Sequence, residues 1–143
     1  MNYPCCTFLG HQDCPSSIAP QVREILQQLI EQECVQTFYI GHQGNFDSLV
    51  YTVLQELAAV YSKLSLFVVL AHWPIHEANL DLSNCIYITD IDEVDLHQAT
   101  FPRNHYMLEW SDIVITYAAN HDSDTAFWAA QARQMGKRVI EIQ

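Results

Sequence analysis

The chain has 143 residues, half of them apolar, and its 17 acidic side chains stand against six lysines and arginines, for a formal charge of −11. This length and composition predict one globular domain over residues 1–143 with an ordinary hydrophobic core. Because so acidic a chain repels phosphate backbones, we expect neither nucleic acid nor an anionic membrane as a partner.

The N-terminal residues lack the basic flank and apolar core of a signal peptide, and no apolar run approaches the roughly 20 residues that a membrane span requires. We therefore expect a cytoplasmic protein. The five cysteines are odd in number and show no paired C-x-x-C spacing. This pattern favours buried, reduced thiols over a disulfide framework or a zinc site.

The first third of the sequence alternates strand and helix patterns. Residues 3–9 are short and apolar and predict a strand, and residues 20–33 carry apolar side chains at helical spacing. Residues 35–40 form the second predicted strand. The clearest helix follows, with apolar residues at three- and four-residue steps over 46–61 and Asn45 as its expected N-cap.

The middle of the chain is less regular. The continuous apolar run 64–70 is typical of a strand covered on both faces. We then expect a loop over 71–84, a short strand at 85–89, an acidic surface loop at 90–100 and a short helix at 103–110.

The last segments return to a clear alternation. We expect a strand at 112–117, a helix at 124–135 closed by Gly136, and a final strand at 138–142. Strands alternating with helices predict an α/β fold, specifically a three-layer, Rossmann-like, doubly wound and mostly parallel sheet of five to six strands.

In such a sheet the loops that follow the strands share one edge, and a ligand is expected in the crevice at the topological switch point. The turn Gly41 to Asp47 is the most informative of these loops, because a glycine-containing strand-to-helix turn presents backbone N–H groups and a helix N-terminus to a ligand. Glycine at Gly10 and Gly44 is also ordinary turn chemistry, so both interpretations stay open at this point.

Four segments carry a resemblance to a known family: residues 7–11, 38–47, 103–107 ahead of 111–115, and 124–125. In this order they resemble the small SLOG-type Rossmannoid proteins, whose superfamily also contains DprA and the Lonely guy phosphoribohydrolases. The resemblance covers nearly the whole chain. It implies a Rossmann-like fold and a nucleotide-like or phosphosugar-like ligand.

The family pattern also implies which positions line the ligand site. Four positions depart from it: Gln12 replaces an arginine, His42 replaces a glycine, and Ser123-Asp124 replaces Gly-Gly. Loss of an arginine removes a bidentate phosphate donor, and Asp124 places negative charge at a helix N-terminus. We therefore expect a ligand less phosphorylated than those of the family. The candidate ligand-binding residues are Gly10, His11, Gln12, Gly41, His42, Gly44, Asn45, Arg103, Asn104, Ser123, Asp124 and Thr125.

The sequence therefore favours a small-molecule binding module that needs no cofactor. The enzyme alternative is an N-glycosidic hydrolase or transferase, in which Asp47 supplies the acidic group and Arg103 anchors the substrate. Asp47 is more readily explained as an early-turn helix acid, and Arg103 is equally explained as half of a surface ion pair. A third alternative is an interaction module that forms a homodimer through the apolar stripe 46–61 and Trp128.

The histidines suggest a separate hypothesis about metal binding. His11, His42, His72 and His121 follow four different predicted strands at the same edge, and neutral imidazole is a common ligand for zinc, nickel or copper. Loop histidines are more often hydrated or bonded to backbone, so the main expectation is that no metal is bound.

Overall fold

The computed structural model describes residues 3–10, 13–42, 44–70, 85–87, 96–118 and 123–142. These residues form a six-stranded sheet in the order β4-β3-β2-β1-β5-β6, and all five neighbouring pairs are parallel. The elements, in chain order, are β1 Cys5–Gly10, η1 Ser16–Ile18, α1 Ala19–Glu33, β2 Thr37–Ile40, α2 Gly44–Ala58, β3 Ser65–Leu70, β4 Cys85–Tyr87, α3 Leu96–Trp110, β5 Ile113–Tyr117, α4 Ser123–Gln134 and β6 Arg138–Ile142.

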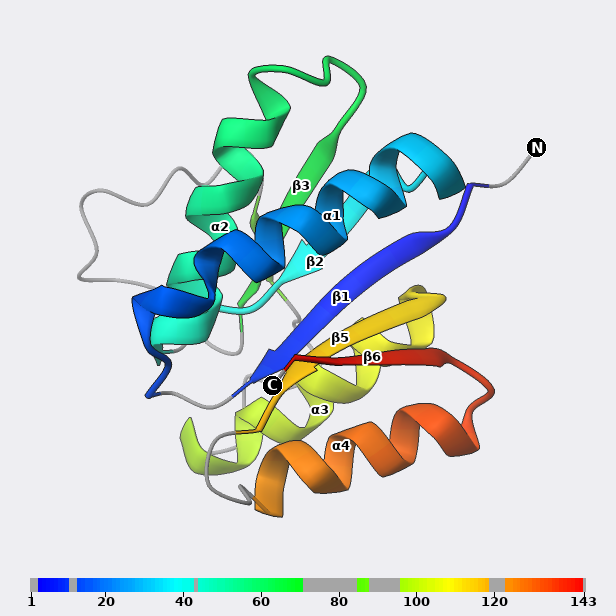
Figure 1. Ribbon diagram of the computed structural model, residues 1–143. Coiled ribbons are helices and arrows are strands. Elements are labelled where there is room, and N and C mark those ends of the chain that lie inside the picture. The colour runs from blue at the N-terminus through cyan, green and yellow to red at the C-terminus, as the bar shows by residue number, and fades with distance from the viewer. Residues whose placement is uncertain are drawn as a thin grey trace.

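The strand order determines where the topological switch point lies. From β1 the chain adds β2, β3 and β4 on one side and then returns to place β5 and β6 on the other. Helices α1 and α2 cover one face of the sheet and α3 and α4 the other (Figure 1). The predicted three-layer, doubly wound α/β fold is therefore confirmed, and its switch point lies between the carboxyl ends of β1 and β5.

The core follows from the alternation of side chains along the central strands. Cys6 and Phe8 of β1 point into the cluster beneath α1 and α2, whereas Leu9 points into the cluster beneath α3 and α4. On β5 the same alternation sends Ile113 to the first cluster and Val114 to the second. A parallel strand covered by helices on both faces needs apolar residues at successive positions, as these strands have.

Helix α2 buries the apolar stripe that the sequence analysis singled out. Phe46, Val50, Val53, Leu54 and Leu57 all belong to the core. The helix begins at Gly44, whose φ is 85°, so Asn45 lies inside it and the predicted N-cap is wrong. Most of the stripe and Trp128 are buried within the chain, although Val60 near its end is 74% exposed, so little of it offers the exposed surface on which the dimer hypothesis relied. The dimer itself stays a prediction.

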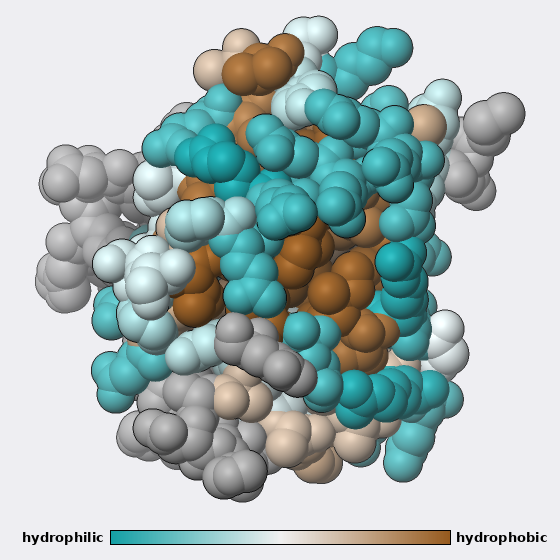
Figure 2. All heavy atoms as spheres, in the orientation of Figure 1, coloured by the Kyte–Doolittle hydropathy of each residue, from teal (hydrophilic) through white to brown (hydrophobic). Residues whose placement is uncertain are grey.

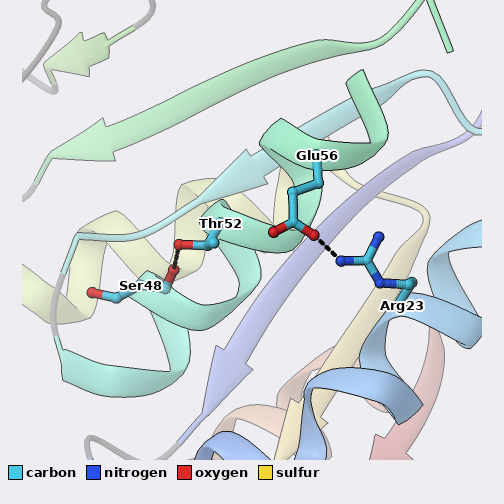
Figure 3. Close-up of polar contacts among 4 residues, drawn as sticks. All are labelled: Arg23, Ser48, Thr52 and Glu56. Atoms are coloured by element: carbon cyan, nitrogen blue, oxygen red, sulfur yellow. Dashed lines mark hydrogen bonds and ion pairs between the residues drawn. The ribbon is translucent and has the colours of Figure 1, made fainter. Parts of the chain in front are cut away.

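An ion pair ties α2 to α1, and a side-chain hydrogen bond lies within α2 itself. Arg23 of α1 donates to the carboxylate of Glu56, and the Thr52 hydroxyl donates to the carbonyl of Ser48 at 3.0 Å (Figure 3). Both side chains of the ion pair are substantially exposed. A pair of this kind contributes about 0–1 kcal/mol, so the packing of the two helices rests mainly on their apolar residues.

Helix α3 is the element that departs most from expectation. It begins at Leu96 rather than at residue 103, so residues 96–100 are helical instead of belonging to an acidic loop. Pro102 lies inside the helix, where it lacks a backbone N–H and normally argues against helix. The apolar residues of this helix also show no clear helical period, so the sequence pattern did not indicate that the helix begins before residue 103.

The cysteines are less uniformly buried than expected. Cys6 is buried, but Cys34 is exposed and the other three are half-buried; none of the five forms a disulfide. Burial raises the pKa of the Cys6 thiol far above its usual value, which leaves it unreactive. Cys34 instead ends α1 in the left-handed conformation, at φ 59°.

The surface of the protein is mainly hydrophilic on the side shown in Figure 2. Hydrophilic residues cover most of the side seen in Figure 2, and apolar residues reach the surface between α1 and the strands below it. Within the described ranges, every helix is too short or too polar to cross a membrane.

Helix α4 ends as the sequence predicts, at a glycine in the left-handed conformation. Gly136 has φ 79°, its N–H donates to the carbonyl of Arg133 and that of Lys137 donates to the carbonyl of Ala132, which together form a Schellman motif. This arrangement needs a positive φ.

We predict that Gly136→Ala lowers the free energy of unfolding by about 1–2 kcal/mol, because a Cβ is strained at this φ even though the space around it is open. Urea unfolding measures the change. Gly136→Asn is the matched control and should cost less, since asparagine tolerates this conformation; equal losses for both variants would contradict the explanation.

Candidate functional site

Two opposite charges converge on Gly41, directly after β2. A Cβ built on Gly41 would lie 2.8 Å from Oδ2 of Asp47 and 3.1 Å from Nη1 of Arg103. Asp47 comes from the first turn of α2 and Arg103 from α3, so the two helix layers meet over the end of β2. Only glycine leaves room for both side chains at this point.

Asn104 holds the guanidinium of Arg103 on one edge. Nε and Nη2 of Arg103 donate to Oδ1 of Asn104 at 3.1 and 2.7 Å, and both side chains are buried. Nε and Nη2 form one of the edges through which an arginine binds a carboxylate or phosphate bidentately. In this protein that edge is occupied by the neighbouring residue on the helix.

The remaining terminal nitrogen of Arg103 is buried and has no acceptor in the part of the chain that the structure describes. Nη1 is inaccessible to solvent and has no hydrogen-bond partner among the described residues, and the whole residue is only 5% exposed. Leaving a buried donor unsatisfied costs about 1–3 kcal/mol, and more for a charged group. A side chain kept at such a cost marks this position as a candidate binding site.

Asp47 offsets part of the cost of burying Arg103. Burial lowers the pKa of Arg103 from its usual value, and the negative charge of Asp47 acts in the opposite direction. The guanidinium stays protonated at neutral pH. Asp47 is itself only 8% exposed, so it is a first-turn acid that also faces a buried cation, rather than a surface helix acid. Likewise, Arg103 is not part of a surface ion pair.

The crevice at the switch point holds an aromatic side chain of the protein itself. Phe46 lies so close to Gly10 that a Cβ there would overlap its ring, and the same ring stacks on Tyr117 with centroids 6.0 Å apart. Gly10 and Tyr117 are register partners at the ends of β1 and β5. Gly10 therefore makes room for Phe46, and the space beside the switch point on the α2 side is filled.

The structure thus brings together Gly41, Asp47, Arg103 and Asn104, and separates others from them. Residues His42, Gly44 and Asn45 are exposed around the start of α2. At the start of α4, which packs on β5, β6 and β1, Thr125 is buried and Asp124 exposed. Ser123 is the first residue of that helix. His11 and Gln12 lie outside the described residues.

The metal hypothesis stays untested. Of its four histidines, His11, His72 and His121 lie outside the described residues, and His42 is exposed. In the part of the chain that the structure describes, no three His, Cys, Asp or Glu side chains are grouped so as to hold a metal ion.

Sequence reasoning missed the Phe46–Tyr117 stack, because nothing in the spacing links the first turn of α2 to the end of β5. A signal did exist: a glycine ends β1, and an aromatic residue opens the helix that packs on β1. It also missed a cavity of about 340 Å³ at the opposite edge of the sheet, which combines apolar and polar side chains without a buried charge. The cavity is lined by Ile30, Gln36, Val60, Tyr61, Ser62, Lys63 and Leu64.

Comparison with known proteins supports the fold. Neither protein-family models nor curated proteins give a match to the sequence. Among solved structures, the chain is similar to the X-ray structure of DNA processing protein A (DprA) from Streptococcus pneumoniae, with a TM-score of 0.73 and 17% sequence identity. The match covers 99% of this chain and 50% of that one, so the chain spans about half the length of DprA. At this identity the similarity shows a DprA-like Rossmann fold.

The contact between Gly10 and Phe46 leads to a testable prediction. Gly10→Ala should destabilise the protein by about 1–3 kcal/mol, because the added Cβ overlaps a ring that is fully buried. The free energy of unfolding in urea measures the loss. Trimming the ring in the double variant Gly10→Ala/Phe46→Leu should make the two losses less than additive; strictly additive losses would show that the contact is not the cause.

Proposed function

We propose that this protein is a small-molecule binding module of the SLOG type, from the small-protein branch of that superfamily, with its site at the carboxyl edge of β2. The ligand is nucleotide-derived or phosphosugar-like. The observation that carries the proposal is the buried Nη1 of Arg103, which has no acceptor among the described residues and faces Gly41 and Asp47.

An unsatisfied buried cation lowers the stability of the fold unless a bound partner compensates for it. A surface arginine would keep its hydration, and a structural one would be saturated by protein acceptors. Two of the three guanidinium nitrogens of Arg103 donate to Asn104, and the third, Nη1, has no acceptor among the described residues. An acceptor atom of a bound ligand would remove the penalty, and binding would then stabilise the folded state.

The distribution of positive charge favours a small ligand over DNA, although the similar solved structure is named a DNA processing protein. Arg23, Arg133 and Arg138 are engaged in exposed ion pairs. Lys63 and Lys137 precede β3 and β6, at the opposite edge of the sheet. Arg103 is thus the one cation at the site, whereas binding of a phosphate backbone requires several.

Asp47 supports an enzyme as the second candidate. A carboxylate held in a buried position beside an arginine can stabilise the positive charge that develops at an anomeric carbon during N-glycosidic cleavage. The reaction would release a free base from a nucleoside or nucleotide.

The binding proposal predicts that a panel of nucleosides, nucleotides and phosphosugars contains compounds that raise the melting temperature of the protein, and that Arg103→Gln abolishes the effect. Thermal unfolding with and without each compound measures it. Arg23→Gln is the matched control, because it removes an arginine from an exposed ion pair and should leave the ligand response unchanged.

Two results would contradict the binding proposal. One is a panel in which no compound shifts the melting temperature of the wild-type protein. The other is a response that Arg103→Gln and Arg23→Gln weaken equally, because the effect would then depend on net charge and not on the buried site.

The enzyme candidate predicts release of free base from the same panel, reduced at least about a hundredfold by Asp47→Asn, since the substitution removes the negative charge and keeps the shape. Chromatography of the reaction products measures it. Ligand-induced stabilisation of the wild-type protein without any base release would reject the enzyme and retain the binding module.

A further inference from the structure

Resting on the proposed function, we infer that the Arg103–Asp47 site recognises an uncharged group in which a hydrogen-bond acceptor and a donor are neighbours. The vicinal hydroxyls of a ribose and the amide edge of a nucleobase both have this chemistry. The ligand class is therefore nucleoside-like, and the site does not hold a phosphate.

Asn104 occupies one edge of the Arg103 guanidinium. Arginine binds phosphate best through two parallel N–H donors of one edge. Asn104 Oδ1 already accepts from both Nε and Nη2, at 3.1 and 2.7 Å. Nη1 has no acceptor among the described residues, so a ligand that displaces no protein contact meets this nitrogen and not the Nε–Nη2 edge.

A negative charge lies next to Nη1. Oδ2 of Asp47 and Nη1 of Arg103 approach the same point beside Gly41, at 2.8 and 3.1 Å from the position of its missing Cβ. Both side chains are more than nine-tenths buried, so their charges are weakly screened. A phosphate that accepts from Nη1 would lie close to the carboxylate and would be repelled by it.

A neutral donor–acceptor group meets neither difficulty. Its acceptor takes the open N–H of Nη1, and its donor is offered to the carboxylate of Asp47. Asp47 already has another interaction, but a carboxylate accepts about four hydrogen bonds and can take one from a ligand as well. The pair Arg103 and Asp47 is neutral in sum, which matches an uncharged partner.

The experiment compares inosine with inosine 5′-monophosphate, using isothermal calorimetry on the full chain. Inosine should bind the wild-type protein at least as tightly as its monophosphate. Asp47→Asn should weaken the binding of inosine and strengthen the binding of the monophosphate. The ratio of the two dissociation constants should change by at least about tenfold, which corresponds to the loss of one hydrogen bond to a charged group. Arg23→Gln should leave the ratio unchanged.

Ribose and hypoxanthine distinguish the two sources of the recognised group. Binding of ribose alone that depends on Asp47 assigns the site to the hydroxyl pair, and binding of hypoxanthine alone assigns it to the base edge. Asn104→Ser provides a second variant in case Asp47→Asn does not fold. It leaves the shorter serine side chain beside the arginine, opens its edge, and should increase the affinity for inosine 5′-monophosphate and for inorganic phosphate.

The outcomes separate this inference from the proposal on which it rests. If the wild-type protein binds the monophosphate more than tenfold tighter than inosine, and Asp47→Asn leaves that preference unchanged, the site holds a phosphate and the inference is overturned, while the binding module stands. If neither compound nor any other member of the panel binds, both are overturned.

Discussion

The buried guanidinium of Arg103 is the constraint on which the rest of the site depends. A charge that is removed from water must be surrounded by acceptors or by opposite charge, or its desolvation exceeds what the fold can tolerate. Asn104 supplies the acceptor from the same helix, and Asp47 supplies the charge from the helix layer on the other face of the sheet. The two side chains meet past the end of β2, where Gly41 leaves room for both.

The candidate site lies at the end of β2 and not at the switch point, where the topology alone would place it. In doubly wound sheets the crevice at the switch point is the usual ligand position. Phe46 lies against Gly10 and Tyr117 there and is fully buried. Its neighbour Asp47 consequently points over the end of β2, because adjacent residues in the first turn of a helix face different directions. The first turn of α2 thus fills the space beside the switch point with Phe46 and places the charge of Asp47 over the end of β2.

The fold was predictable because strands and helices with strong periodicity carry their own signal. The last strand, residues 138–142, and the Gly136 helix end were placed from sequence to within a residue, since alternation and a left-handed glycine are local properties. The start of α3 was not, because Pro102 hides a helix whose stability comes from packing on β1 and β3. Tertiary contacts override propensity there.

The candidate site was predictable as a set of residues and not as an arrangement. Gly41, Asp47, Arg103 and Asn104 were all named from the sequence, through their positions after predicted strands and the SLOG resemblance. That Asn104 occupies one edge of Arg103, and that Asp47 reaches the same point from the other layer, depends on side-chain directions that no spacing encodes. For the same reason Gly10 looked like a ligand contact, although its neighbour is an aromatic ring.

The net charge of the whole chain and the charges within the candidate site both disfavour an anionic ligand. Over the whole chain, 17 acidic residues and a formal charge of −11 produce a field that disfavours the approach of anions. Within the site, the one cation is paired with a carboxylate and has one edge filled by an amide. A fold shared with DprA does not fix function, because function depends on the residues placed on the fold. Here those residues are an arginine and an aspartate of opposite charge, with Nη1 of the arginine lacking an acceptor among the described residues; this arrangement favours our proposal of an uncharged hydrogen-bonding ligand over an anionic one.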